Sequence, residues 1–154
     1  MLKCPNNVSR KFPIVLVIDD APKFTEFCKT VIEKSIKWVR VRVAKDGIEG
    51  LKAYKKYNPD LVLLDLNMPK LDGISVLKAI MKDNFNVKVV VTTAYDDSQE
   101  TINQMIKLGA HGFLPKPMNL ILLTKTISDA LYNGKVAGTH NKVSKSFVLN
   151  HNYN

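Results

Sequence analysis

The sequence predicts an α/β protein, a doubly wound sheet of five parallel strands with helices on both faces. Short apolar runs alternate with longer stretches of helical periodicity through most of the 154 residues, which is typical of βα units joined by right-handed crossovers. With 45% hydrophobic residues and two cysteines, a chain of this length can bury a core without disulfides or structural metals.

Five segments have the character of strands, because they are short and rich in branched aliphatic residues. They are residues 14–18, 39–44, 60–66, 87–93 and 110–114. The first, third and fourth are continuous apolar runs, as expected for strands that are covered on both faces.

Apolar residues at helical spacing follow each of these segments. The first four sets are Phe24, Phe27, Cys28 and Val31; Ile48, Leu51 and Tyr54; Ile74, Leu77 and Met81; and Ile102, Met105 and Ile106, while a last helix is predicted over residues 119–132. Pro22 suits a first helical turn, Asn58-Pro59 ends the second helix, and Gly109 suits a helix C-cap. Asp72-Gly73 is interpreted as a turn that opens the third helix.

One folded domain is expected, over residues 13–132, after an N-terminal extension over residues 1–12. Residues 133–154 show neither helical nor alternating periodicity and are predicted to form a flexible basic tail. Neither a run of about 18 apolar residues nor a signal-peptide pattern is present, so we expect no membrane span and a cytoplasmic location.

The formal net charge of +9 raises the question of nucleic acid. Residues 23–56 carry ten basic and four acidic residues, which makes one side of the molecule locally basic. Aromatic residues do not interleave with these cations in a way that marks base stacking, and solvated lysines on helix faces are the simpler interpretation. Nucleic acid is therefore not the expected partner.

Polar residues follow the predicted strands at the edge of the sheet where doubly wound proteins bind ligands. Asp19-Asp20 end the first strand, Asp65 ends the third, Thr93 ends the fourth, and Pro115-Lys116-Pro117 follow the fifth. If the first and third strands are neighbours, about 4.8 Å apart, three carboxylates share one pocket. Two charges at 4 Å repel by about 4 kcal/mol at an effective dielectric constant near 20. Lys116 and a hard divalent cation, Mg²⁺ or Mn²⁺, would balance them.

These residues together resemble the receiver domain of response regulators, of the chemotaxis-receiver type. The resemblance covers about residues 13–132 and rests on Asp19-Asp20, Asp65 within Leu-Val-Leu-Leu-Asp-Leu-Asn-Met-Pro, Asp72-Gly73, Thr93-Ala94 and Lys116-Pro117. It implies a flavodoxin-like fold with strand order 2-1-3-4-5 and a cis Lys116–Pro117 bond.

The resemblance also implies roles for individual residues. Asp65 takes the place of the phosphoacceptor, which ligates the metal as well. Asp20 is a direct metal ligand, Asp19 a ligand acting partly through water, and Asn67 a ligand through its backbone carbonyl. Thr93 and Lys116 would contact the phosphoryl oxygens, and Phe113 would be the aromatic switch residue that fills the space Thr93 vacates. Tyr95 lies where the family modulates dephosphorylation.

The expected function is that of a stand-alone phosphoacceptor switch in a two-component phosphorelay, not an enzyme. It would take a phosphoryl group from a histidine kinase or phosphotransfer protein, with slow autodephosphorylation, and change its affinity for an unidentified downstream protein. A monomer is favoured.

Three other functions are weighed against it. A haloacid-dehalogenase-like phosphatase needs a second aspartate where Asn67 stands, and Asn67 cannot shuttle a proton. A DNA-binding regulator would have to use the basic surface or tail, because the 22 residues after Tyr132 cannot form a helix-turn-helix domain. A degenerate receiver that only binds partners conflicts with the intact acidic set.

Overall fold

The computed structural model describes residues 12–94 and 98–133. Five parallel strands form one sheet in the order β2-β1-β3-β4-β5, which confirms the predicted fold class and strand order. The strands are β1 (Ile14–Ile18), β2 (Arg40–Ala44), β3 (Leu61–Asp65), β4 (Lys88–Ala94) and β5 (Gly112–Lys116). The helices are α1 (Pro22–Ser35), α2 (Gly47–Tyr57), α3 (Gly73–Asp83), α4 (Gln99–Lys107) and α5 (Leu120–Ser128), followed by a π-helical turn, Asp129–Asn133.

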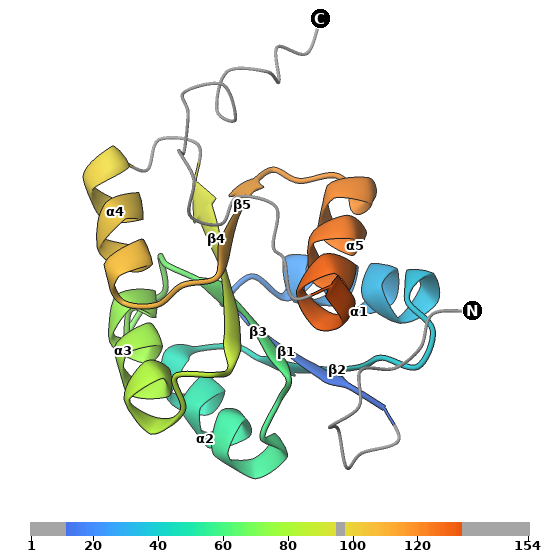
Figure 1. Cartoon of the computed structure of the whole chain (residues 1–154), viewed down its shortest axis with the longest axis horizontal. Helices are drawn as coiled ribbons and strands as arrows, with labels where there is room; N and C mark the ends of the chain where they lie inside the picture. Colours follow the sequence, from blue (N-terminus) through green and yellow to red (C-terminus); the bar gives the residue numbers. More distant parts are fainter. Residues whose placement is uncertain (1–11, 95–97, 134–154) are drawn as a thin grey trace, which may run out of the picture.

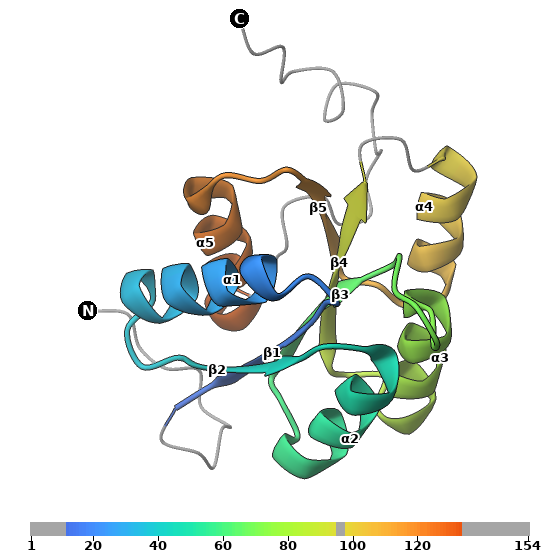
Figure 2. The ribbon, with the colours of Figure 1, turned by 180° about the vertical axis from the view of Figure 1, so that it is seen from behind.

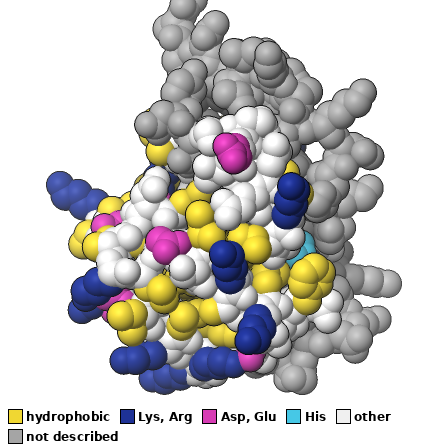
Figure 3. Space-filling view, turned by 90° about the vertical axis from the view of Figure 1, so that its left-hand side faces the viewer, with side chains coloured by type: hydrophobic (Ala, Val, Ile, Leu, Met, Phe, Trp, Pro, Cys, Tyr) yellow, Lys and Arg dark blue, Asp and Glu magenta, His cyan; other side chains and the backbone are white. Residues whose placement is uncertain are grey.

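Helices cover both faces of the sheet, with α1 and α5 on one face and α2, α3 and α4 on the other (Figures 1 and 2). Alternate residues of a strand therefore enter two separate cores. In β1, Val15 and Val17 pack against the α1–α5 layer, whereas Leu16 and Ile18 pack against the α2–α4 layer. All four are fully buried. On the outer surface of the α2–α4 layer, basic side chains surround exposed hydrophobic ones (Figure 3).

Local signals fix most helix boundaries. Four helices begin at a residue whose side chain accepts a hydrogen bond from the backbone N–H three positions later; these are Asp46, Asp72, Ser98 and Asn119. Pro22 lies in the first turn of α1. Gly109 follows α4 with a φ of 102°, and Asn58 ends α2 in the left-handed region. The predicted turn at Asp72, the C-cap at Gly109 and the end of α2 are confirmed.

The predicted range of the fifth strand, 110–114, is wrong by two residues, since β5 comprises Gly112–Lys116. Pro115 indicates the end of a strand in the sequence because it has no N–H to donate. β5 pairs only with β4, and an edge strand tolerates a proline, here opposite Thr93. The correction makes Lys116 the last residue of a strand instead of a loop residue.

The last predicted helix, residues 119–132, begins one residue later than predicted, because Asn119 is its N-cap. It also changes type, since α5 ends at Ser128 and a π-helical turn follows. The N-terminal extension, the basic tail and Tyr95 lie outside the described residues, apart from Phe12 and Asn133. Among the helices of residues 12–94 and 98–133, none is long and apolar enough to cross a membrane.

The outer edge of β2 is covered at Val41 by two side chains of α1. The Val41 N–H donates to Glu33 Oε1 at 3.0 Å, and Lys29 Nζ donates to the Val41 carbonyl at 3.4 Å and to Glu33 at 2.8 Å. Burial disfavours the Glu33 carboxylate, but the hydrogen bonds from Lys29 and Val41 and the positive charges of Lys29 and Arg42 together lower the pKa of Glu33. The pair thus occupies main-chain groups that could otherwise template another strand.

We expect Glu33→Ala to lower the free energy of unfolding by about 1 kcal/mol, because the Val41 N–H loses its acceptor. The folded-state pKa of Glu33 is lowered, so its stabilisation is complete above about pH 4.3 and is lost as the pH falls through the lower folded value. The difference between parent and variant should shrink below that pH. Urea unfolding at pH 7 and pH 3 measures this difference in the free energy of unfolding. Glu26→Ala, an exposed residue of the same helix, is the control, and equal losses in the two variants would contradict the assignment.

Candidate functional site

Three carboxylates gather at the carboxyl edge of the sheet. Asp19 and Asp20 follow β1, and Asp65 is the last residue of β3. These strands are neighbours, with Ile18 opposite Leu64, so their ends meet. One oxygen from each carboxylate lies within 4.8 Å of the others. This confirms that the three side chains share one pocket, as the strand-end positions predict.

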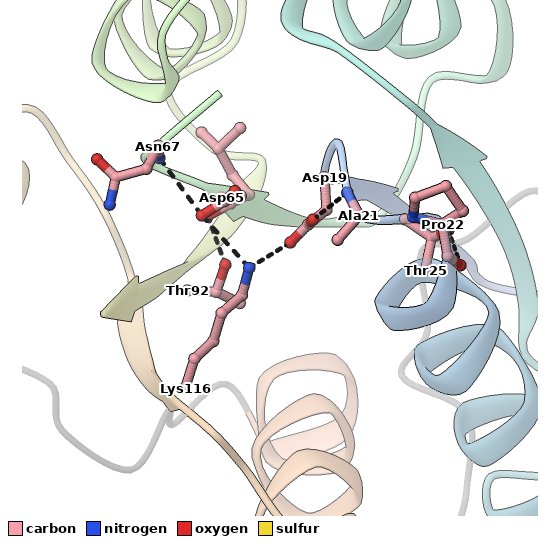
Figure 4. A network of polar contacts seen from close by, with 9 residues as sticks. Asp19, Ala21, Pro22, Thr25, Asp65, Asn67, Thr92 and Lys116 are labelled. Atoms are coloured by element: carbon pink, nitrogen blue, oxygen red, sulfur yellow. Dashed lines mark hydrogen bonds and ion pairs between the residues drawn. The ribbon is translucent and has the colours of Figure 1, made fainter. Parts of the chain in front are cut away.

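The Lys116 ammonium lies between two of these carboxylates (Figure 4). Its Nζ is 2.5 Å from Asp19 Oδ2 and 3.5 Å from Asp65 Oδ1. The Lys116–Pro117 peptide bond is cis, as the resemblance implies. One ammonium faces three carboxylates, so the pocket retains an excess of negative charge that favours a cation.

Asp65 is the carboxylate whose ionisation the fold opposes. It is 6% exposed, and its Oδ1 accepts a hydrogen bond from the Asn67 N–H at 3.4 Å. Burial raises the pKa of Asp65; the Lys116 charge opposes the rise and the Asp19 charge adds to it. A cation placed against this carboxylate would therefore relieve an unfavourable charge.

The two acidic residues after β1 differ in what they offer a ligand. Asp19 is 1% exposed and already engaged, since its Oδ1 accepts from the Ala21 N–H at 2.8 Å and its Oδ2 from Lys116. Asp20 is exposed. Its carboxylate oxygens are the most accessible of the three for an incoming ion.

Phe24 contributes to the site, although its place in the sequence does not indicate it. The Lys116 ammonium lies 4.3 Å from the centroid of the Phe24 ring, within the range of a cation–π interaction. In the sequence Phe24 belongs to an apolar helical stripe and is assigned to the core. No local signal distinguishes it, because its partner comes from the opposite end of the domain.

The start of α3 packs closely against the end of β3, next to Asp65. The Gly73 N–H donates to the Leu66 carbonyl at 3.0 Å. A Cβ at position 73 would overlap the Asp65 carbonyl oxygen and lie 2.6 Å from Leu66 Cα. Glycine is therefore required where α3 packs against the end of β3, a constraint beyond the turn that the sequence predicts.

Thr93 and Phe113 lie on the other face of the sheet from Asp65 and Lys116. Phe113 packs against the α2–α4 core, to which Val89 and Val91 also belong, and the alternation of β4 directs Thr93 to the same side. Thr93 is 6% exposed. The two predicted switch residues thus share one face of the sheet, whereas the ion pairs of Lys116 lie on the opposite face. The Thr92 side chain lies on the same face of the sheet as Asp65, and its Oγ1 donates to the Leu64 carbonyl at 3.4 Å (Figure 4).

The chemistry of the donors fits a hard divalent cation. Carboxylate oxygens and the Asn67 carbonyl are ligands that suit Mg²⁺ or Mn²⁺. The nearby Cys28 thiol is fully buried, and burial, with a contribution from Asp19, raises its pKa to about 12. A protonated thiol is a poor metal ligand.

Comparisons with known proteins agree with this geometry. Residues 15–128 match the family model of the response regulator receiver domain. The probable C4-dicarboxylate response regulator DctR of Bacillus subtilis (strain 168) is 42% identical over 114 residues, covering 73% of this chain and 50% of DctR. The transcriptional regulatory protein DegU of Brevibacillus brevis is 30% identical over 134 residues, covering 87% of this chain and 56% of DegU. The chain thus spans about half the length of these relatives.

Solved structures show the same fold. The receiver domain of the Francisella response regulator 1452 has a TM-score of 0.70 at 36% identity, covering 79% of this chain and 98% of that one. The Vibrio cholerae chemotaxis protein CheY4 has a TM-score of 0.71 at 26% identity, covering 78% of this chain and 99% of that one. With the family model matching most of its length, this chain belongs to the receiver domain family of two-component response regulators.

Proposed function

We propose that Asp65 accepts a phosphoryl group from a histidine kinase or a phosphotransfer protein, and that phosphorylation changes the affinity of the chain for a downstream protein. The observation that carries this proposal is a buried carboxylate at the end of a central strand, paired with Lys116 and flanked by two further carboxylates. Residues 13–132 act as one receiver unit. The chain is a phosphoacceptor regulator that assists its own phosphorylation and slow dephosphorylation.

The transfer is a displacement at phosphorus. An Asp65 oxygen forms an O–P bond while the N–P bond of a phosphohistidine breaks, and the histidine nitrogen keeps the electron pair and takes up a proton. The loose transition state needs mainly positioning and neutralisation of the phosphoryl oxygens. Lys116, already 3.5 Å from Asp65, is the cation that the chain itself supplies.

Asp19, Asp20, Asp65 and the backbone carbonyl of Asn67 would hold Mg²⁺ or Mn²⁺, which supplies the remaining positive charge when bound. The exposed Asp20 is suited to direct ligation. Asp19, whose oxygens are engaged by Ala21 and Lys116, is suited to ligation partly through water.

Thr93 and Phe113 form the switch in this proposal. Thr93 follows the residue paired with Asp65 in the sheet, so a phosphoryl oxygen offers its hydroxyl a partner that the unphosphorylated site lacks. This differential contact is what a two-state element requires. Phe113, on the same face of the sheet, would fill the space that Thr93 leaves.

We expect Asp65→Asn to abolish labelling by acetyl phosphate, because the amide is isosteric but not nucleophilic. The variant should stay folded at pH 7, since it removes a carboxylate whose charged form the fold disfavours. Phosphate-affinity electrophoresis and thermal unfolding measure the two effects. Full labelling of a folded Asp65→Asn protein would refute the phosphoacceptor assignment.

Labelling should require Mg²⁺ or Mn²⁺ and should fall about 100-fold in Asp20→Ala, because a metal ion contributes several kcal/mol to charge neutralisation. Excess chelator should have the same effect on the parent protein. Glu26→Ala, an exposed acidic residue of α1, is the control and should label normally. Unchanged labelling in chelator would show that no metal is needed.

Thr93→Ala should accept the phosphoryl group without converting to the second state, and Lys116→Ala should label more weakly and also fail to convert. The reason is that conversion requires a contact that differs between the states. The measurement is the amide chemical shifts of Phe113 and α4 before and after beryllofluoride with Mg²⁺. Thr92→Ala is the matched control and should convert. If Thr93→Ala shows the parent's shifts, Thr93 is a structural residue.

A further inference from the structure

Trp38 is an exposed aromatic residue in an unusual backbone conformation. It lies between α1 and β2 with a φ of 70°, in the left-handed region that favours glycine, and 65% of its surface is exposed. A bulky residue is rarely found there, and such outliers concentrate at functional sites. An ordinary connection between these elements does not need a tryptophan.

The Trp38 ring is held in a stack. It lies parallel to the Phe12 ring, with centroids 5.5 Å apart and an interplanar angle of 4°. The Arg40 guanidinium lies 5.1 Å from the Phe12 centroid. We call Phe12, Trp38 and Arg40 the Trp38 stack. Because Phe12 covers one face of the indole and 65% of Trp38 is exposed, we infer that the residues the structure describes leave the other face open to a further planar group.

The surroundings of the Trp38 stack are basic. Lys34, Lys37, Arg40, Arg42 and Lys45 lie between positions 34 and 45, where the sequence has no acidic residue. The acidic residues on either side of this segment are engaged elsewhere. Glu33 binds Lys29 and the Val41 N–H, and Asp46 caps α2 and pairs with Lys70 at 3.4 Å. Lys45 lies 4.0 Å from Glu49, and Arg42 lies over the Tyr57 ring. Lys34, Lys37 and Arg40 form no salt bridge with a described carboxylate, so these three cations are the ones available to a partner.

We propose that the Trp38 stack binds single-stranded nucleic acid, with one base on the open face of Trp38 and the neighbouring phosphates near Arg40 and Lys37. Sequence-tolerant binding of single strands combines an aromatic platform with a positively charged track, and the stack supplies both. The sequence argues against nucleic acid because its aromatic residues do not interleave with the cations in a way that marks base stacking, and because solvated lysines are the simpler interpretation. Folding removes the first of these objections by bringing Phe12 to Trp38.

A protein partner is the competing occupant of this surface. An acidic peptide would be attracted by the same cations, but it does not need an extended parallel stack of rings. A nucleobase is planar and has a π face on each side, so it can extend the stack by lying on the open face of Trp38. This binding is independent of Asp65, so phosphoacceptor chemistry and nucleic-acid binding can fail separately.

The chain has one tryptophan, so its fluorescence reports on Trp38 directly. The full-length protein is titrated with a 12-mer of deoxythymidine, with inorganic polyphosphate of matched charge, and with an acidic peptide. We expect quenching by the oligonucleotide that weakens as salt increases, since bound phosphates release counterions. Polyphosphate should bind more weakly and leave the fluorescence nearly unchanged. Quenching by the acidic peptide at lower concentration than by the oligonucleotide would overturn the proposal in favour of a protein partner.

Variants then separate stacking from charge, with a labelled 12-mer and fluorescence anisotropy as the readout. Trp38→Ala should weaken binding by about fivefold or more, Trp38→Phe should restore most of it, and Arg40→Ala should weaken binding and reduce the salt dependence. Phe85→Ala removes another exposed aromatic residue, 69% exposed and outside the stack, and should bind like the parent. Circular dichroism confirms folding, and labelling of Asp65 by acetyl phosphate confirms an intact receiver site. Equal affinities of folded Trp38→Ala and Phe85→Ala, or no binding by the parent, would overturn the proposal.

Discussion

The site depends on one electrostatic constraint, the close approach of three carboxylates at one edge of a parallel sheet. Asp19 and Asp65 are both buried, and like charges at such distances repel strongly. Lys116 is brought from the far end of the domain to lie between them, and the Phe24 ring supports its ammonium. The residual negative charge leaves the pocket suited to a cation.

Strand alternation divides the chemistry between the two faces of the sheet. Asp65 and Lys116 belong to the α1–α5 side, whereas Thr93 and Phe113 belong to the α2–α4 side. Thr92, opposite Asp65 in register, and Thr93 beside it take different sides of the same strand. The carboxylate and the α2–α4 layer are therefore separated by a single residue of β4, which is why the switch proposed above runs through Thr93.

The two edge strands, β5 and β2, carry features that an interior strand could not have. β5 carries Pro115, which an interior strand would not tolerate, and ends at Lys116. β2 is covered at Val41 by Lys29 and Glu33. Trp38 follows α1 and precedes β2, so the Trp38 stack gives this border of the sheet an aromatic and cationic surface as well.

The fold class and the presence of the acidic pocket follow from the amino-acid sequence alone. Alternating periodicities, the caps at Asp72 and Gly109 and the acidic residues at strand ends are local signals, and a parallel sheet brings strand ends together whatever the details. Three features become visible only in the folded chain: β5 extends to Lys116, Phe24 lies on the ammonium of Lys116, and Phe12 stacks on Trp38. The sequence pattern could not show these features, because each depends on the distance between segments remote along the chain, and that distance is set by how helices and strands pack.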